Sequence, residues 1–384
     1  MKILYPIEGD GGGAITHVLT LASQLEKWKI ETFIVFISSG PSVDTALNQG
    51  LNFKVLPCRF FPDFTLIRRF ANIIEKEKVD IVHTHTIRGN FYGRMAALLS
   101  RRPTVSMTTV HSFLIDELGG SAHIGLKQRM LYHRETLTRR FVDHFVSVSR
   151  TLGDKLLQEE VKQDRLSVIC HGIPIPANSD NNFHGSRLRS EFGIKKKETV
   201  IGIVGRLVSV KNHALFLLAA ERVLRFIPEV KFLIIGDGAL RADLEKLTSD
   251  LNISESVIFT GWRNDIEECM KAIDVLVLCS TTESQGLVIL EAMSFALPVI
   301  ATDVNQVRET VINGRTGLLI PSNDDEALAE AMLKLLKNDN LAKRLGAQGR
   351  ALVEDKYSLE KMIHETANLY KMMDERKRLS PNGR

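Results

Sequence analysis

Strand-like and helix-like segments alternate along almost the whole sequence, and this alternation limits the possible folds more than any other feature. Short runs rich in Val, Ile and Phe are typical of buried strands, and amphipathic segments are typical of helices. Their repeated succession indicates βα units around parallel sheets, so we predict an α/β fold. The predicted strands are Lys2–Tyr5, Thr32–Ile37, Asp80–His83, Thr104–Thr109, Phe145–Val148, Ser167–Ile169, Val200–Val204, Val230–Ile235, Val257–Thr260, Val275–Leu278, Pro298–Ala301 and Gly317–Ile320.

A change of composition divides the chain into two halves of similar size. Residues 174–198 are rich in Pro, Asn, Ser and charge, and we interpret 176–198 as a linker that ends in a short helix. We predict one Rossmann-like domain over 1–175, another over 199–357, and a C-terminal helix over 358–384 that packs back on the first domain. Two doubly wound domains would then face each other across a cleft, and ligands would bind at the carboxyl ends of the strands.

Composition excludes several classes of protein. No apolar run approaches the ~18 residues of a membrane span, and the first strand is too short for a signal peptide. We therefore expect a cytoplasmic protein. The four cysteines have no CxxC or other metal-like spacing, which favours buried reduced thiols over disulfides or zinc.

Positive charge is concentrated in the first half of the chain. Residues 1–190 contain 24 Lys and Arg against 18 Asp and Glu, whereas residues 191–384 contain 26 against 28. The basic pairs at 68–69, 101–102 and 139–140 belong either to an ordinary solvated surface or to a face that meets anionic lipid or an anionic acceptor. Because no aromatic residues interleave with these pairs, we do not expect nucleic-acid binding.

Glycines crowd the loop that follows the first predicted strand. The segment IEGDGGGAITHV (7–18) includes Gly12 and Gly13 just before a helix, whose amino end favours anions. A dinucleotide site would need G-x-G-x-x-G and an acidic residue at the end of the second strand, which here ends in Phe-Ile-Ser-Ser. We therefore do not expect NAD binding, and the loop is either an anion-binding loop or a flexible turn.

Two cations follow the first strand of the second half. The segment GRLVSVKNH (205–213) places Arg206 and Lys211 in a strand-to-helix loop. Both cations suit the binding of a diphosphate. Both could also neutralise the negative charge that builds up on a diphosphate as it leaves. The alternative is that both are ordinary surface cations. At the end of another predicted strand, Trp262 and Arg263 are candidates for contact with a base, although packing is the expected role of Trp262.

Two carboxylates, Glu283 and Glu291, bracket the start of an apolar helix. The amides of Gly286, Leu287 and Val288 would be first-turn donors without intrahelical partners, which makes an anion site. A carboxylate beside an anion site is favourable when it accepts hydrogen bonds from vicinal diols. A nucleoside diphosphate sugar meets both demands; the alternative is that Glu283 caps the helix and Glu291 is merely exposed.

These segments resemble the family-4 retaining glycosyltransferases of the GT-B fold. In the second half, GRLVSVKNH, FLIIGDGALRADLEKL, VIFTGW, DVLVLCSTTESQGLVILEAM and LPVIATDVNQVRETVINGRTGLLI occur in the family's order and spacing. In the first half the resemblance rests on GGAITHVLTLA, DIVHTHT, TTVH and VSVS. It implies an acceptor-side domain over 1–175, a nucleotide-sugar donor domain over 199–357, and a retaining transferase of the hexosyltransferase class.

The resemblance also implies roles for single residues. Arg206 and Lys211 would hold the donor diphosphate, and Glu291 the ribose hydroxyls. Glu283, with the amides of residues 286–288, would hold the transferred sugar and the phosphate. From the other domain, Gly12 and Gly13 would approach the donor, and His111 would lie over the sugar near the reacting carbon; this last role depends on the resemblance alone.

The sequence departs from the family pattern in three places. The family often reads E-G-x-G where this chain has Glu283-Ser284-Gln285-Gly286. This departure leaves the identity of the sugar open. Ala296 replaces a usual Gly, and Asn305-Gln306 replace a frequent Gly pair in the loop beyond Asp303.

We expect transfer without a metal or a cofactor, from a nucleotide-sugar donor to a glycan or glycolipid acceptor. No D-x-D triplet occurs, so Arg206, Lys211 and the helix amino end would replace the metal electrostatically. An epimerase or phosphorylase on the same architecture, or a non-catalytic nucleotide-sugar binding protein, are the alternatives. The basic first half is compatible with a lipid-linked or cell-surface acceptor and with peripheral contact at the inner face of an anionic membrane.

Overall fold

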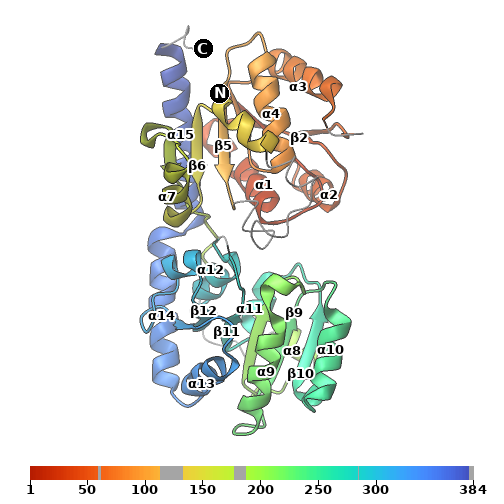
Figure 1. Cartoon of the computed structure of the whole chain (residues 1–384), viewed down its shortest axis with the longest axis vertical. Helices are drawn as coiled ribbons and strands as arrows, with labels where there is room; N and C mark the ends of the chain where they lie inside the picture. The colour runs from red at the N-terminus through yellow and green to blue at the C-terminus, as the bar shows by residue number, and fades with distance from the viewer. Residues whose placement is uncertain (59–61, 113–132, 177–186, 284, 380–384) are drawn as a thin grey trace. The chain divides into compact units, whose positions relative to one another are not determined.

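The computed structural model describes residues 1–58, 62–112, 133–176, 187–283 and 285–379. The chain forms two compact units, which are described separately (Figure 1). Unit 1 comprises Met1–Gly172 and Glu360–Arg384, and unit 2 comprises Ile173–Leu359. In the part of the chain that the structure describes, every helix falls short of the length and apolarity that a bilayer span requires.

Unit 1 is built on a parallel sheet in the order β3-β2-β1-β4-β5-β6-β7. Its strands are β1 (Lys2–Ile7), β2 (Glu31–Phe36), β3 (Phe53–Val55), β4 (Ile81–Thr84), β5 (Val105–Val110), β6 (His144–Ser147) and β7 (Leu166–Val168). The helices are α1 (Gly13–Leu25), α2 (Pro41–Asn48), α3 (Phe64–Lys76), α4 (Ile87–Leu99), α7 (Arg150–Gln158) and α15 (Leu359–Leu379), with 3-10 turns η1 (Glu26–Trp28), η3 (Arg139–Phe141) and η4 (Gln163–Arg165).

Unit 2 has a parallel sheet in the order β10-β9-β8-β11-β12-β13. The strands are β8 (Val200–Val204), β9 (Lys231–Ile235), β10 (Val257–Gly261), β11 (Val275–Leu278), β12 (Val299–Thr302) and β13 (Leu318–Ile320). Around them lie α8 (Arg187–Glu191), α9 (His213–Leu224), α10 (Arg241–Asp250), α11 (Ile266–Ala272), α12 (Leu287–Ser294), α13 (Asp325–Leu336) and α14 (Asp339–Lys356), with η6 (Ser209–Lys211), η7 (Ser254–Ser256) and η8 (Asn305–Glu309). Both sheets confirm the predicted α/β fold.

Helix α3 illustrates how the sequence produces these layers. Asp63 is its N-cap and accepts hydrogen bonds from the amides of Thr65 and Leu66, which have no intrahelical partner. Side chains at helical spacing, among them Leu66, Phe70 and Ile74, then point into the core between α3, α4 and the sheet. Each such large apolar side chain contributes roughly 1.5–3 kcal/mol through burial.

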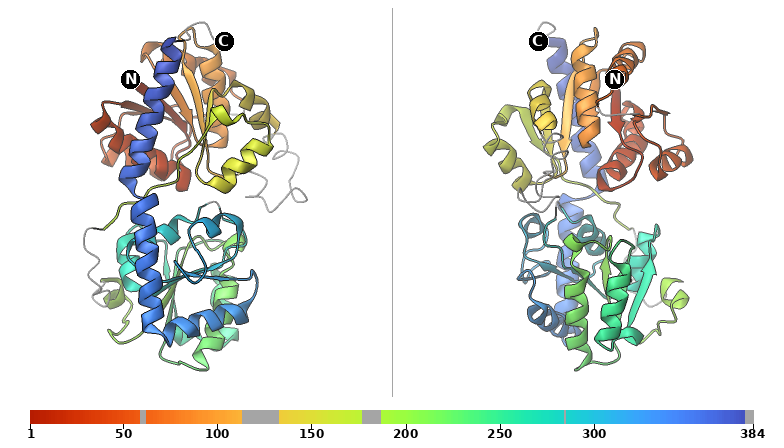
Figure 2. Two further views of the ribbon diagram at one scale, coloured as in Figure 1. Left: turned by 90° about the vertical axis from the view of Figure 1, so that its left-hand side faces the viewer. Right: turned by 45° about the vertical axis from the view of Figure 1, so that its right-hand side comes forward.

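Helix α15 belongs to unit 1, although the chain reaches it only after unit 2 is complete (Figure 2). Its buried face includes Met362, Ile363, Leu369, Tyr370 and Met373. The Tyr370 hydroxyl bonds to the hydroxyl of Tyr5 at 2.8 Å and to His83 Nδ1 at 2.5 Å. These buried polar contacts fix α15 against β1 and β4.

Candidate active site

The order of the strands in unit 2 reverses between β8 and β11. In parallel sheets, ligands bind outside the carboxyl ends of the strands at such a switch point. Arg206 and Lys211 follow β8, and Glu283 follows β11, so the two predicted loops lie on either side of the switch point. The amide of Thr281 donates to the carbonyl of Val210 at 2.9 Å and ties these loops together.

Glycine allows a neighbouring loop to approach the Arg206 loop closely. A Cβ atom at Gly236 would lie 2.0 Å from the Gly205 carbonyl oxygen, and one at Gly238 would lie 2.5 Å from that of Leu207. Gly236 also has a φ of 137°, which side chains other than glycine rarely adopt. The predicted glycine turn after β9 therefore positions the Arg206 loop by backbone packing.

Lys211 and Glu283 form an ion pair within the predicted site. Lys211 Nζ lies 2.5 Å from Glu283 Oε2, and both side chains are mostly shielded from solvent, with exposures of 23% and 12%. The Ser280 hydroxyl donates to the same carboxylate oxygen at 3.0 Å. The pair thus joins the cation and the carboxylate that were predicted to act on one ligand.

Gly286 is the N-cap of α12 and has the left-handed φ of 67°. No side-chain hydrogen bond caps the helix, so the structure does not support the alternative in which Glu283 is its cap. Leu287 and Val288 occupy the first turn, where an amide has no carbonyl four residues earlier in the helix. These amides lie directly after the loop that carries Glu283, as an anion site requires.

Glu291 lies within α12 and is not a solvated surface residue. Burial raises the pKa of Glu291 to about 7. Burial, more than the nearby carboxylates, raises the pKa of the Cys269 thiol on α11, and Glu291 is one of those carboxylates. Among the described residues, Glu291 has no hydrogen bond to Arg206, Lys211 or Glu283, so the structure brings Lys211 and Glu283 together but not Glu291 with either.

Arg206 is exposed, and no described residue forms an ion pair with it, which leaves its guanidinium available to a ligand. Trp262 is also exposed, at 73%, so the expected packing of this side chain is wrong. Arg263 instead forms ion pairs with Asp265 and Glu191 at 2.6 and 2.8 Å. Of these two candidates for a base contact, only Trp262 therefore has a free face.

In unit 1 the strand order reverses between β1 and β4, and the glycine loop follows β1. Gly12 is the N-cap of α1 with a φ of 117°, and a Cβ atom there would meet no atom within 4 Å. Gly13 begins the helix and is exposed. The loop therefore offers open backbone next to a helix amino end, as predicted for a ligand-binding loop.

His111 directly follows β5, at the same edge of the unit 1 sheet. Its two ring nitrogens are both engaged: Nδ1 lies 3.1 Å from His171 Nε2, and Nε2 lies 3.1 Å from His85 Nδ1. Burial and the neighbouring rings lower the pKa of His111 well below its usual value, so the ring is neutral near pH 7. His111 can therefore bond to a sugar only by giving up one of these two partners.

The histidines around His111 were missed in the sequence. His85 directly follows β4, His171 comes three residues after β7, and His17 lies on α1 just beyond the glycine loop. Because the carboxyl ends of parallel strands meet at one edge, histidines that repeatedly follow strands could have predicted this cluster.

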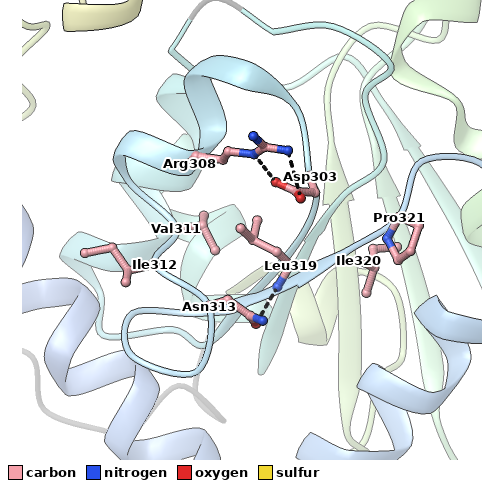
Figure 3. Close-up of a pocket in the computed structure, with 8 residues that line it drawn as sticks. All are labelled: Asp303, Arg308, Val311, Ile312, Asn313, Leu319, Ile320 and Pro321. Atoms are coloured by element: carbon pink, nitrogen blue, oxygen red, sulfur yellow. Dashed lines mark hydrogen bonds and ion pairs between the residues drawn. The ribbon is translucent and has the colours of Figure 1, made fainter.

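A surface hollow of about 580 Å³ lies elsewhere in unit 2, at the edge of the sheet beside β13 (Figure 3). Its lining includes apolar side chains and the ion pair between Asp303 and Arg308, whose Nε lies 2.5 Å from the carboxylate. None of the predicted site residues lines this hollow. We place the candidate active site at the β8–β11 switch point, because the Lys211–Glu283 ion pair and the first-turn amides of α12 lie there. The segment 305–309, which includes Asn305-Gln306, forms the 3-10 turn η8 beside the hollow.

Solved structures share this architecture. The Anabaena protein HepE in complex with UDP and glucose matches 97% of this chain and 100% of its own, with a TM-score of 0.83 and 20% sequence identity. Sucrose-phosphate synthase from Thermosynechococcus elongatus matches 97% of this chain and 99% of its own, with a TM-score of 0.76 and 21% identity. Together with the two parallel sheets, these matches define the fold as GT-B.

The sequence matches family models over both units. Residues 186–352 match the model for glycosyl transferases group 1, and residues 11–175 match glycosyltransferase family 4. The Escherichia coli UDP-Gal:alpha-D-GlcNAc-diphosphoundecaprenol alpha-1,3-galactosyltransferase is 31% identical over 341 residues, 86% of each chain. N-acetyl-alpha-D-glucosaminyl L-malate synthase of Bacillus anthracis is 26% identical over 380 residues, 95% of this chain and 94% of its own. The chain belongs to the family-4 glycosyltransferases and is a glycosyltransferase, which confirms the predicted family.

Proposed function

We propose that this protein transfers a sugar from a uridine diphosphate sugar to a hydroxyl of a lipid-linked or cell-surface glycan intermediate, with retention of anomeric configuration and without a metal. The observation that carries this proposal is the Lys211–Glu283 ion pair beside the first-turn amides of α12. A cation and free amides suit the diphosphate, and the carboxylate suits the hydroxyls of the sugar.

The charges of unit 2 suggest how the donor would react. Arg206, Lys211 and the α12 amides would stabilise the negative charge that builds up on the diphosphate as its bond to the sugar breaks. Glu283 is bonded to Lys211 and Ser280, which makes its carboxylate a weak nucleophile. We therefore propose direct attack by the acceptor hydroxyl on the face that the diphosphate leaves, with the departing phosphate as a partner for the hydroxyl proton.

Relatives support the choice of donor and acceptor. HepE was solved in complex with UDP-glucose, and the Escherichia coli relative is named for a UDP-sugar donor and a diphosphoundecaprenol-linked acceptor. Glu291 would bind the ribose hydroxyls of the uridine, as the family resemblance implies. The donor panel described below tests the base and the sugar together.

Helix α3 supplies a surface for the lipid that such an acceptor carries. Phe64 is 68% exposed at the amino end of α3, and Arg68, Arg69 and Lys76 are exposed along the same helix. An exposed aromatic ring with basic neighbours suits an anionic bilayer surface, where each cation contributes about 1 kcal/mol. We propose a cytoplasmic protein with peripheral membrane contact through this helix.

Binding and turnover of nucleotide sugars test the donor site. A thermal-shift panel of nucleoside diphosphates and their sugars should show the largest rise in melting temperature with uridine compounds. The K211A variant should lose about 100-fold or more in transfer rate, because it removes one charge that stabilises the leaving diphosphate. The matched control is K271A, since Lys271 forms an ion pair with Glu267 on α11 of the same unit. Full activity of K211A would contradict the proposal, as would conversion of the donor without any acceptor.

Sedimentation with vesicles tests the membrane contact. The R68A/R69A variant should bind vesicles of anionic lipid about tenfold or more weakly at low salt, given about 1 kcal/mol per cation. The K196A/K197A variant of unit 2 removes the same charge from exposed positions and should bind as the wild type does. If the vesicles retain both variants equally, the proposed membrane contact through α3 is wrong.

A further inference from the structure

Four imidazole rings of unit 1 form a continuous row of hydrogen bonds. His17 Nδ1 lies 3.0 Å from His171 Nδ1, and His171 Nε2 lies 3.1 Å from His111 Nδ1. The chain continues from His111 Nε2 to His85 Nδ1 at 3.1 Å. The rings come from α1 and from the residues after β4, β5 and β7, so four separate elements converge on this row at the carboxyl edge of the sheet.

The rings at both ends of the chain are largely buried. His85 Nε2 is buried and has no hydrogen-bond partner among the described residues, and His17 at the other end keeps 8% exposure. His83 packs against His85 with ring centroids 4.2 Å apart, but its own hydrogen bonds go to Tyr370 and Thr109. The described hydrogen bonds of His17, His85 and His111 all go to rings of the chain.

Proton counting limits this chain to two arrangements. Each neutral imidazole carries one proton, and each nitrogen–nitrogen hydrogen bond needs one proton between its atoms. In the first state His17 is protonated on Nδ1 and the other three rings on Nε2. In the second state His17 is protonated on Nε2 and the other three on Nδ1. Any other assignment of four neutral rings leaves one link with two protons or with none.

We propose that His17, His85 and His171 are positioning residues for His111, which hold its ring in place and couple its tautomer to theirs, so that the four rings together adopt either the first or the second state. This inference rests on the proposed transferase function, together with the family resemblance, which implies that His111 lies over the sugar. A sugar hydroxyl that takes the place of His85 at His111 Nε2 meets a donor in the first state and an acceptor in the second. The proton of a ring as distant as His17 thus determines what His111 presents to the substrate.

The tautomers themselves provide the first test. Imidazole ¹⁵N NMR of the full-length protein at pH 7.5 distinguishes protonated from bare nitrogens, with assignment by single His-to-Gln variants. We expect His85, His111 and His171 to share one tautomer and His17 to show the opposite one. Different tautomers among the first three rings, or a ring protonated on both nitrogens, would overturn the proposal.

Cutting the chain provides the second test. H171Q should let His111 populate both tautomers, and should lower kcat about tenfold to 100-fold, a size typical of a misplaced reacting group. The KM for the donor should change less than kcat, because the ring acts after binding. H144Q is the matched control, since His144 is buried in the same unit but bonds to Ser167. It should keep the wild-type kcat and the wild-type tautomers.

A replacement variant and a comparison with transfer activity complete the experiment. If H171Q does not fold, H17Q replaces it, and a change in the His111 tautomer across the intervening His171 ring supports the proposal. An unchanged His111 tautomer in the cut variant overturns it. Coupled tautomers in a wild-type protein that transfers no sugar would support the ring chain and overturn the transferase assignment, whereas normal transfer with uncorrelated tautomers would overturn the ring chain alone.

Discussion

At the scale of a single residue, the burial of Glu291 opposes its proposed role in binding ribose. Burial raises its pKa to about 7, so ionising it costs free energy in the folded protein, whereas binding of ribose hydroxyls needs the ionised form. The folded pKa lies above the unfolded one, so the folded state holds the proton more tightly. Stability therefore falls as the pH rises from about 4.5 to 7 and stays at its lower value above pH 7.

The E291Q variant should separate these two effects. It removes the ionisable group, so at pH 8 its melting temperature should exceed that of the wild type by roughly 3 °C or more, with little difference at pH 5. Its affinity for UDP should fall, and wild-type affinity should rise between pH 6 and pH 8 as the carboxylate forms. Thermal melts and calorimetric titrations with UDP measure both quantities. The exposed Glu330 on α13 provides the control variant E330Q, which should match the wild type at each pH.

The sequence could predict that Lys211 and Glu283 act on one ligand, but not the rings around His111. The first two residues follow strands of unit 2 that had been identified from their apolar patterns, and parallel topology alone brings such loops together. The ring chain depends on side-chain rotamers and on hydrogen bonds between residues as distant as His17 and His171, which no local pattern specifies. The 2.5 Å contact between Lys211 and Glu283 could not be predicted from the sequence either, because it is set by packing of the Ser280 loop.

At the scale of elements, the carboxyl end of α12 explains the departure at Ala296. The amide of Leu297 donates to the carbonyl of Ala292, and the amide of Ala296 donates to that of Met293, which is the Schellman pattern of helix ends. This pattern places Ala296 at a left-handed φ of 56°, where glycine is usual. The missing glycine is therefore a local backbone cost and not a change in the site.

Restoring the glycine should stabilise the protein. A left-handed conformation costs an L-residue about 1–2 kcal/mol, and glycine removes this cost. Glycine also loses more conformational entropy on folding, which offsets about 0.5–1 kcal/mol of the gain. The A296G variant should therefore gain about 0.5–1 kcal/mol, measured by urea unfolding with unchanged transfer activity. A292G, four residues earlier inside the same helix, should instead lose about 1 kcal/mol or more. A loss in A296G as large as that in A292G would contradict this account.

Most strands were predicted to within about two residues of their ends, because a buried parallel strand has a continuous apolar run. The strand β3 (Phe53–Val55) was missed, since three residues at the edge of a sheet, none of them buried, give too short a pattern. Burial of Trp262 was predicted wrongly for a related reason. Aromatic composition favours burial, but only the positions of neighbouring chains decide whether a ring after a strand is covered.

At the scale of the whole molecule, acid should act more strongly on unit 1 than on unit 2. Burial lowers the pKa of His83 to about 3 and that of His171 to about 4. Burial and neighbouring rings also lower the pKa values of His17, His85 and His111 well below 6.5. In unit 2, His213 shows the same effect, with a pKa lowered to about 4. Burial likewise lowers the pKa of His144 to about 4, so the described part of unit 1 contains six rings that must stay neutral to remain buried.

The sign of the effect follows from proton binding. Below pH 6.5 the unfolded chain protonates these histidines, whereas the folded unit does not until the pH nears the lowered values, so stability is constant above about pH 6.5 and falls as the pH drops. Each such ring contributes a slope of about 1.4 kcal/mol per pH unit. Tryptophan fluorescence resolves the units, because Trp28 reports on unit 1 and Trp262 on unit 2. In urea titrations, the W262F variant reports on unit 1 through Trp28. Its free energy of unfolding should therefore fall by several kcal/mol between pH 6.5 and pH 5, at about 1.4 kcal/mol per ring and pH unit. The W28F variant reports on unit 2, and its free energy of unfolding should fall much less. Equal losses in the two variants would show that the buried rings do not set the acid limit.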